Sequence, residues 1–290
     1  MYKISCPATT ANIGPGFDTL GMALNLYNHF YFDRRDEFEF EGIDEKYANT
    51  DNLVIKSYIS AFDYKHENVQ PVLLKMDVNV PLSRGLGSSA TCIIAGLLGA
   101  NLYLKNKMTE EEILSLATKI EGHPDNVAPC LLGGLVASFV SDKVYYVKYS
   151  VSENIKIMAL VPDFPLSTEA SREVLPKSIS IKDAVYNISH AINIPYAFTN
   201  GKLDLLYECL NDKIHQPYRF PLINDSKLFI YYAKNNKLPL VISGAGSTLL
   251  MLSNKYEEIN IDTKASWKIL NISCNMEGSI VHESWLFYCT

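Results

Sequence analysis

The chain has 290 residues, of which 48% are hydrophobic and 20% are charged. These proportions exclude a disordered or fibrous protein, and the length suits two compact domains, since a domain usually holds about 100–200 residues. Lys and Arg number 26 against 32 Asp and Glu, which gives a net charge of −6. This balance excludes a protein that wraps nucleic acid, because neutralising phosphates takes clustered positive charge.

The cysteines and the apolar runs point to the cytoplasm. Six cysteines are scattered along the chain, with no C-x-x-C pair and no histidine at zinc-binding spacing, so we expect reduced thiols. The N-terminus lacks the apolar core of a signal peptide. The strongest apolar run, 92–100, is far shorter than the roughly 18 residues that a membrane span needs. We therefore expect a cytoplasmic protein with neither a membrane nor a nucleic-acid partner.

The first half of the chain mixes predicted strands and helices. Alternating or β-rich composition predicts strands over 2–6, 24–32, 37–41 and 72–80. An apolar stripe at helical spacing predicts a helix from Ser88. A second helix is expected to begin at Thr109, where Thr-Glu-Glu-Glu offers a capping box. It should run to about Glu121, with Gly122 and Pro124 ending it.

The second half reads as a β-hairpin, one strand and then mostly helices. The expected strands are 135–140, 143–148, 155–161 and 279–288, and the expected helices are 181–198, 203–210 and 226–233. Strands and helices intermingle without strict alternation, which predicts an α+β fold rather than a doubly wound parallel sheet. We expect an N-terminal domain over residues 1–150 and a C-terminal domain over 151–290.

A glycine-rich loop lies between a predicted strand and a predicted helix. Its two glycines allow a tight turn and a close approach to a ligand, and the helix N-terminus offers unpaired N–H groups to a phosphate. An ordinary turn with Ser88 as N-cap explains the pattern equally well. The loop is neither a Walker A motif nor a dinucleotide-binding fingerprint. The residues expected at the phosphates are Pro81, Leu82, Ser83, Arg84, Gly85, Leu86, Gly87, Ser88, Ser89, Ala90 and Thr91.

Three motifs resemble those of the GHMP kinases. They are the loop from Pro81, the run Pro-Ala-Thr-Thr-Ala-Asn-Ile-Gly-Pro-Gly-Phe-Asp from Pro7, and Ser-Gly-Ala-Gly-Ser-Thr from Ser243. The third has Ser247 where the family often has proline. The resemblance implies the use of ATP. It also implies a two-domain fold with a deep cleft between an N-terminal nucleotide-binding domain and a C-terminal α+β domain.

Three further stretches resemble the homoserine kinase branch of that family. They are Glu-Gly-His-Pro-Asp-Asn-Val-Ala-Pro at 121–129, Ser-Thr-Glu-Ala-Ser-Arg at 167–172 and His-Gln-Pro-Tyr-Arg at 215–219. The resemblance covers nearly the whole chain. It implies that ATP phosphorylates the side-chain hydroxyl of L-homoserine to give O-phospho-L-homoserine, a step of threonine biosynthesis.

A pocket for homoserine needs a cation for the carboxylate and an anion or polar group for the ammonium. Arg172 and Arg219 are the candidates for the carboxylate, because a guanidinium grips it bidentately. The resemblance places four more residues around the ammonium and the hydroxyl, namely Asn12, Asp18, His123 and Asp125. Taken singly, Arg172 also reads as a solvated surface residue and His123 as a turn residue.

The resemblance also implies a magnesium ion and an adenine site. Glu121 and one hydroxyl of Ser88 or Ser89 resemble the Mg²⁺ ligands of the family, and hard oxygen atoms suit this ion. Asn52 occupies a stretch that lies near the adenine in relatives. It equally well caps a helix that begins there.

The resemblance implies that the residues nearest the reaction are Asn126, Asp125, Thr168 and Arg172. Phosphoryl transfer depends mainly on alignment and charge stabilisation. The amide of Asn126 orients the hydroxyl but cannot accept a full proton, so we expect late proton transfer to a phosphate oxygen, with Asp125 binding the ammonium. Thr168 is a further candidate for positioning substrate or phosphate. A helix cap is the structural alternative for Asn126.

Two other functions stay open from the sequence. One is a kinase for another small hydroxylated metabolite of the GHMP superfamily, and the other is a non-catalytic homologue that binds a ligand. The loop glycines, both serines and Glu121 are present, which argues against a degenerate copy. The resemblance leaves a homodimer open, but no apolar stripe in the sequence identifies an interface.

Overall fold

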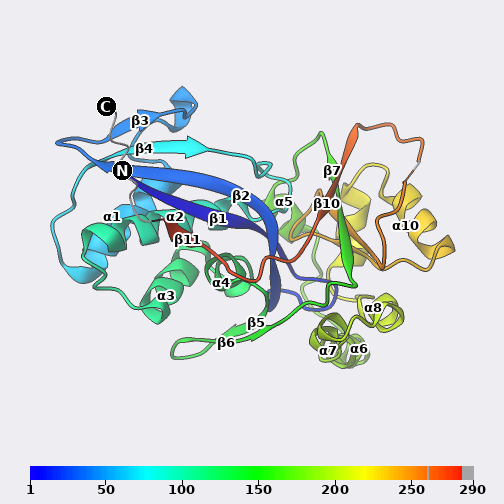
Figure 1. Cartoon of the computed structure of the whole chain (residues 1–290). Helices are drawn as coiled ribbons and strands as arrows, with labels where there is room; N and C mark the ends of the chain where they lie inside the picture. The colour runs from blue at the N-terminus through cyan, green and yellow to red at the C-terminus, as the bar shows by residue number, and fades with distance from the viewer. Residues whose placement is uncertain (260, 283–290) are drawn as a thin grey trace.

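The structure is a computed structural model that describes residues 1–259 and 261–282. Within these residues, two β-sheets each carry helices packed against them (Figure 1). Nearly all neighbouring strands are antiparallel, and strands and helices do not alternate regularly along the chain. The α+β fold expected from the sequence is therefore confirmed.

The strands of the first sheet come mainly from the first half of the chain. One path runs in the order β11 (Ile280–His282), β1 (Tyr2–Ala11), β2 (Leu20–Arg34), β4 (Val72–Asp77) and β3 (Glu39–Glu41). The other end of β2 pairs with β5 (Leu135–Val140), which pairs in turn with β6 (Val144–Tyr149). The second sheet has the order β10 (Trp267–Ile272), β7 (Lys156–Pro162), β9 (Leu249–Ser253) and β8 (Leu240–Ile242).

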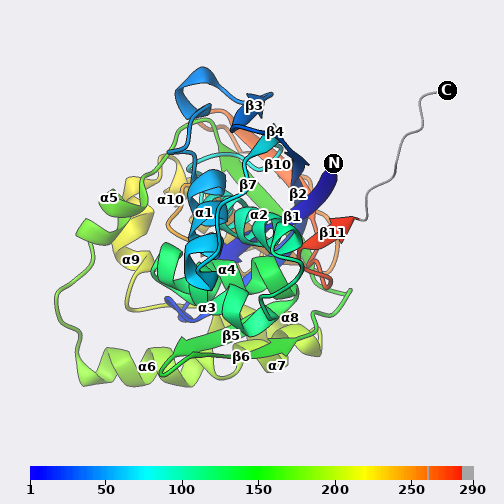
Figure 2. The same ribbon diagram turned by 90° about the vertical axis from the view of Figure 1, so that its left-hand side faces the viewer.

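The helices fall into two groups. Those of the first group are α1 (Leu53–Lys65), α2 (Ser88–Tyr103), α3 (Glu110–Glu121) and α4 (Pro124–Leu132). They cover one face of the first sheet (Figure 2). Those of the second group are α5 (Thr168–Glu173), α6 (Ile181–Ala191), α7 (Ile194–Thr199), α8 (Leu203–Cys209), α9 (Gln216–Arg219) and α10 (Ser226–Asn235). Short 3-10 turns occur at Glu45–Tyr47 and Phe220–Leu222.

A shared hydrophobic core joins the two sheets. Ile157 and Ala159 of β7 pack in one cluster with Met22 of β2, while the alternate residues Met158 and Leu160 face the cluster under α10. Because successive side chains of a strand point to opposite faces, β7 is buried on both sides. Burial on both faces explains why this stretch reads as a continuous apolar run.

A register shift between β1 and β2 accompanies a change in what the side chains of β1 contact. The pairing of β1 with β2 slips between Pro7 and Ala8. Before the slip, Ile4 and Cys6 face the helices of the first group. After it, Ala8 packs in the shared core, whereas Thr9 hydrogen-bonds to a residue of α4. Irregularities of this kind re-aim a side chain beside many active sites.

The helix boundaries largely follow the sequence signals, with two corrections. The capping box at Thr109 and Glu112 is formed, and Gly122 ends α3 in the left-handed conformation. Pro124 does not simply follow that end, because it opens α4, where its missing N–H costs nothing. The single helix expected over 181–198 is two helices, α6 and α7, since Pro195 in the first turn of α7 has no N–H to continue the hydrogen bonds of α6.

The sheets separate near the predicted boundary at residue 150, apart from one returning strand. The strand β11 pairs with β1, so the end of the chain rejoins the first sheet. The remainder of the strand expected over 279–288 lies outside the described residues. The division into 1–150 and 151–290 stays a prediction. In the described part of the chain, no helix is both long and apolar enough to cross a lipid bilayer.

Candidate active site

A cavity of about 690 Å³ lies where residues from both halves of the chain meet. The loop 81–89 and the N-terminal end of α2 form one wall, and the turn 244–246 forms another. Every predicted substrate, metal and reaction residue lies on this cavity: Asn12, Asp18, Asn52, Ser88, Ser89, Glu121, His123, Asp125, Asn126, Thr168, Arg172 and Arg219. The structure therefore brings together residues that lie more than two hundred positions apart in the sequence.

Two loop glycines are required by close contacts with the other sequence motifs. Gly87 has φ of 66°, and a Cβ there would lie 1.8 Å from Oγ1 of Thr9. Gly85 has φ of 75°, and a Cβ would lie 2.1 Å from the carbonyl oxygen of Ser243. The Ser243 hydroxyl donates to the Gly85 carbonyl at 2.6 Å. The three motifs are therefore one packed unit, and only glycine fits at these positions.

The beginning of α2 differs from the simple capped turn. Gly87 rather than Ser88 is the N-cap, and it makes no side-chain cap. The Ser88 hydroxyl is buried and has no hydrogen-bond partner among the described residues. Ala90 and Thr91, expected at the phosphates, instead face the protein interior and do not line the cavity. The exposed amides of the helix N-terminus remain available to an anion.

Oxygen atoms suited to a hard cation gather beside this helix end. The Ser89 hydroxyl donates to Oε2 of Glu121 at 2.8 Å. Burial raises the pKa of Glu121, so a cation here would be favoured by the otherwise uncompensated carboxylate. Together with the unpartnered Ser88 hydroxyl, this donor set fits Mg²⁺.

The first turn of α4 presents three polar side chains. His123 is the N-cap residue, and its Nδ1 contacts Oδ1 of the buried Asp125, which raises the pKa of the histidine. Asn126 lies inside the helix, so the reading of Asn126 as a cap is wrong. Its Oδ1 accepts a hydrogen bond from Oγ1 of Thr9 at 2.7 Å. The amide is thereby fixed with its acceptor occupied, which leaves the NH₂ group as the side that can donate.

Asp18 and Arg172 form a two-pronged ion pair across the cavity. The distances are 3.1 Å from Nη1 to Oδ2 and 2.8 Å from Nη2 to Oδ1. The backbone N–H of Asp18 donates to Oδ1 of Asn12, and Nδ2 of Asn12 donates to the Gly244 carbonyl. One ligand atom each of Asp18, His123 and Asp125 lies within 4.8 Å of the others. Positive and negative groups thus face each other in a small space.

Arg219 is an arginine buried almost completely, with 1% of its surface exposed. Its Nε donates to the Ser171 carbonyl at 3.0 Å, and its Nη1 donates to the Gly244 carbonyl at 3.3 Å. Burial and the nearby charge of Arg172 lower the pKa of Arg219 to about 10, which leaves it charged at neutral pH. In the described part of the chain, no carboxylate forms an ion pair with it.

Several site residues were not identified from the sequence. The guanidinium groups of Arg172 and Arg219 lie 5.6 and 5.1 Å from the ring centre of Phe17, so one aromatic ring contacts both cations. Phe17 also packs against His215. Phe17 and His215 both stood within motifs used for the family resemblance, but nothing in their residue type indicated these contacts. Asn52 does cap α1, accepting from the N–H of Val54 at 2.9 Å, and it also lines the cavity.

The chain is similar to known proteins over nearly its whole length. The family model for the GHMP kinases N terminal domain matches residues 52–134. A homoserine kinase of Clostridium beijerinckii is 44% identical over 98% of this chain and 99% of that protein. One of Clostridium acetobutylicum is 40% identical over 97% of this chain and 100% of that protein. The chain belongs to the homoserine kinase family.

Solved structures show the same relationship. The crystal structure of homoserine kinase from Cytophaga hutchinsonii superposes with a TM-score of 0.84 at 25% identity, covering 97% of each chain. A mevalonate kinase superposes with a TM-score of 0.67 at 14% identity, covering 95% of this chain and 99% of the other, and so shares the fold. The expected GHMP kinase fold is confirmed.

Replacing Gly87 with alanine should weaken ATP binding. A left-handed conformation costs a residue with a Cβ roughly 1–2 kcal/mol, and the contact with Thr9 adds to that cost. The loop would relieve this strain by shifting out of its phosphate-binding conformation. Restoring that conformation would cost binding free energy, so we expect at least about a tenfold rise in the dissociation constant for ATP. Gly201→Ala is the matched control, because Gly201 also has positive φ (63°) but lies in the loop after α7. An unchanged ATP affinity in folded Gly87→Ala, measured by titration calorimetry, would contradict this assignment.

Proposed function

We propose that this protein transfers the γ-phosphoryl group of ATP to the side-chain hydroxyl of L-homoserine. The observation that carries the proposal is the position of Arg172 and Arg219 on the same cavity as the loop 81–89. A phosphate-binding helix end faces a pair of guanidinium groups across a space that fits a small molecule. The homoserine kinases at 40–44% identity over nearly the whole chain support the same reaction.

The charged groups match the charges of homoserine. Arg219 and Arg172 would bind the carboxylate, because both residues line the cavity and both guanidinium groups lie close to the same ring, that of Phe17. Asp18 and Asp125 would bind the ammonium. In the structure, Asp18 pairs with Arg172. A zwitterion would replace this ion pair by two, one between its carboxylate and Arg172 and one between its ammonium and Asp18. A substrate with only one of these charges would leave a partner uncompensated.

The loop and its neighbours would hold the nucleotide. The amides at the start of α2 would bind phosphate oxygens, and the residues at 42–53 that line the cavity beyond the loop, Asn52 among them, would enclose the adenine. Ser88 or Ser89 and Glu121 would hold Mg²⁺, which supplies charge neutralisation to the phosphates when bound. These residues align the phosphates, which is the main requirement of phosphoryl transfer.

The orientation of Asn126 supports a donor role in the reaction. Thr9 occupies its acceptor oxygen, so its NH₂ group would contact the homoserine hydroxyl or a phosphate oxygen. The buried Asp125, which contacts His123, would then bind the ammonium rather than take the hydroxyl proton. The proton would pass late, to a phosphate oxygen. Thr168, at the start of α5 beside the cavity, would position the substrate or the phosphate.

Loss of either arginine should selectively reduce use of homoserine. An ion pair with a carboxylate contributes about 1.5–3 kcal/mol, so Arg172→Ala and Arg219→Ala should raise the KM for homoserine by about 10- to 150-fold. The KM for ATP should change little. Arg35→Ala is the control, since Arg35 pairs with Asp33 on the far strands of the first sheet.

The assay is ADP release with L-homoserine, mevalonate, galactose and shikimate as acceptors. The proposal predicts that homoserine is preferred by orders of magnitude. Turnover of one of the other three in its place would assign the site to another small metabolite, and no ADP release with any acceptor would support a non-catalytic homologue. We also propose a cytoplasmic location, which the use of ATP as phosphoryl donor supports.

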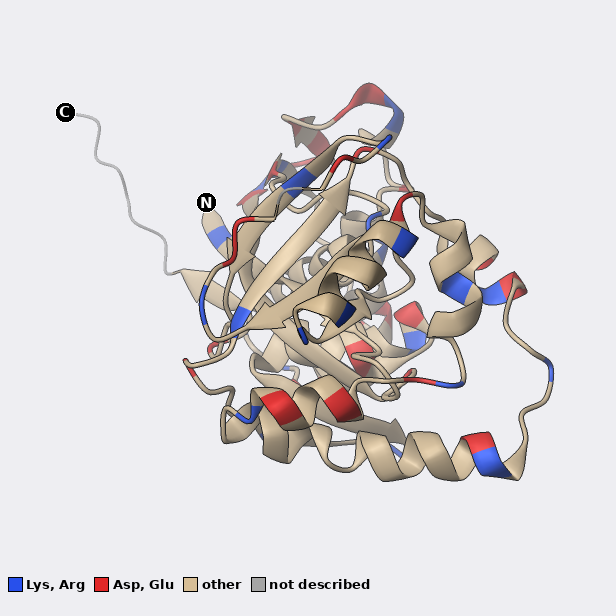
Figure 3. Ribbon diagram, turned by 90° about the vertical axis from the view of Figure 1, so that its right-hand side faces the viewer, with Lys and Arg blue, Asp and Glu red and all other residues tan. Residues whose placement is uncertain are grey.

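We also propose that the protein forms a homodimer through α6. The usual burial pattern of an amphipathic helix is reversed in α6. Its polar Asn187 is buried, while Ile181, Ile188 and Ile192 are 84%, 62% and 71% exposed. Its charged residues, Lys182 and Asp183, are confined to its beginning. The long helix at the lower right of Figure 3 is accordingly blue and red at one end only. The β5–β6 hairpin, also at the lower edge of the molecule in Figures 1 and 2, adds further exposed apolar side chains.

A helix that turns its apolar side chains to solvent and buries a polar one is unusual on a monomer, and a second copy would cover this face with an equally apolar face. Sedimentation equilibrium should give twice the chain mass of 32.5 kDa. Ile188→Glu should shift the protein to the monomer, because it would bury a charge in the interface. Tyr231→Glu is the control, since Tyr231 is similarly exposed, at 70%, but lies on α10. A wild-type monomer at all concentrations would refute the dimer.

A further inference from the structure

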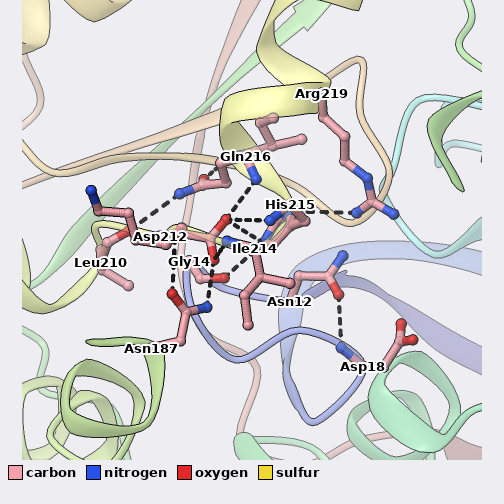
Figure 4. Close-up of polar contacts among 12 residues, drawn as sticks. Asn12, Gly14, Asp18, Asn187, Leu210, Asp212, Ile214, His215, Gln216 and Arg219 are labelled. Atoms are coloured by element: carbon pink, nitrogen blue, oxygen red, sulfur yellow. Dashed lines mark hydrogen bonds and ion pairs between the residues drawn. The ribbon is translucent and has the colours of Figure 1, made fainter. Parts of the chain in front are cut away.

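A buried carboxylate that does not line the cavity lies behind the substrate arginine. The side chain of Asp212 is completely buried. Asp212 does not line the cavity, and it belongs to none of the sequence motifs that predicted the site. Its Oδ1 accepts from Nδ2 of Asn187 at 2.6 Å and from the N–H of Ile214 at 3.0 Å. Its Oδ2 accepts from the N–H groups of His215 and Gln216 at 2.8 and 2.6 Å (Figure 4).

These bonds fix the start of α9, which carries Arg219 at its end. A helix of one turn has no stability of its own, so its direction depends on the groups that hold its first N–H donors. Asp212 holds two of them, those of His215 and Gln216. The side chain of Gln216 also fixes the start of α9, because its Oε1 accepts a hydrogen bond from the N–H of Ile242, beside the turn 243–246.

His215 connects this arrangement to the guanidinium itself. Its Nε2 lies 2.7 Å from the Gly14 carbonyl, which can only accept, so Nε2 carries the proton. Its Nδ1 is then an acceptor, and it lies 3.4 Å from Nη1 of Arg219 (Figure 4). Burial lowers the pKa of His215, which keeps the ring neutral and its acceptor available to the arginine.

The negative charge of Asp212 also compensates the buried cation. Arg219 lies near the like charge of Arg172, and Asp212 is among the carboxylates whose charge opposes this effect. Both charges are shielded from water, so their interaction is weakly screened. Asp212 therefore influences Arg219 through geometry and through charge, without lying against the substrate.

We infer that Asp212 is a positioning residue for the substrate carboxylate, acting through His215 and the first turn of α9 on Arg219. The inference rests on the proposed function, because it assigns the substrate carboxylate to Arg219. Asn187 of α6 donates a hydrogen bond to Asp212 and so helps to hold the carboxylate in this position. The affinity for homoserine is thus set partly by residues that never contact it.

The test is Asp212→Asn, which keeps the shape of the side chain but removes its charge and one acceptor. We expect the KM for homoserine to rise by about tenfold or more, with kcat and the KM for ATP within about twofold of wild type. In the Arg219→Ala background, the same substitution should have no further effect on this KM, because the interaction that it supports is already gone. A purely structural role would not produce that non-additivity.

Asp225→Asn is the matched control. Asp225 also accepts from a backbone N–H, that of Ala265 at 2.9 Å, and from the indole of Trp267, but it begins α10 away from the cavity. Its loss should lower the melting temperature and leave the KM for homoserine unchanged. If Asp212→Asn fails to fold, Asn187→Ala is the milder variant, and the same KM-specific rise is expected from it.

The outcomes separate this inference from the proposed function. If the wild type phosphorylates homoserine but folded Asp212→Asn has the wild-type KM for homoserine, the inference alone is overturned. Full additivity of Asp212→Asn with Arg219→Ala in this KM would also overturn the inference alone. Absence of homoserine turnover in the wild type would overturn both. A rise in the KM for homoserine in the Asp212 and Asn187 variants, with Asp225→Asn at the wild-type value, supports both the inference and the proposed function.

Discussion

The site depends on a positive charge held inside the protein. Arg219 is almost entirely buried, and the atoms that it contacts directly are two carbonyl oxygens and the neutral nitrogen of His215. Carbonyl dipoles partly offset the cost of removing a charge from water, but an opposite charge offsets it more fully. A substrate carboxylate would supply that charge. The free-energy cost of burying the charge of Arg219 would therefore favour a ligand with an acid group.

The turn 243–246 makes this arrangement part of the fold. On one side, Ser243 packs against Gly85 of the phosphate loop, and on the other, the Gly244 carbonyl accepts from both Asn12 and Arg219. The nucleotide end and the substrate end of the cavity are therefore fixed by the same few residues. Since the two sheets also share a hydrophobic core, the distance between these ends is a property of the whole molecule.

The sequence predicted the elements and the chemistry better than the contacts. Capping signals located α3, and motif order placed Asp18, Arg172 and Arg219 in one site. The sequence did not predict that Asp18 and Arg172 pair with each other, because a long-range ion pair leaves no local signal. It missed Asp212 for the same reason, since an isolated Asp in a turn reads as solvated. It did not predict the exposed apolar face of α6, because the apolar spacing there is that of an ordinary buried face and only the structure turns that face to solvent.

The central claim is that a buried arginine recognises the acid group of the substrate. The most direct measurement compares kcat/KM for L-homoserine with that for 3-amino-1-propanol, which keeps the ammonium and the hydroxyl but lacks the carboxylate. The account predicts a loss of two orders of magnitude or more in the wild type, at about 1.4 kcal/mol for each factor of ten, and a much smaller difference in Arg219→Ala. Equal kcat/KM values for the two compounds in the wild type would contradict it.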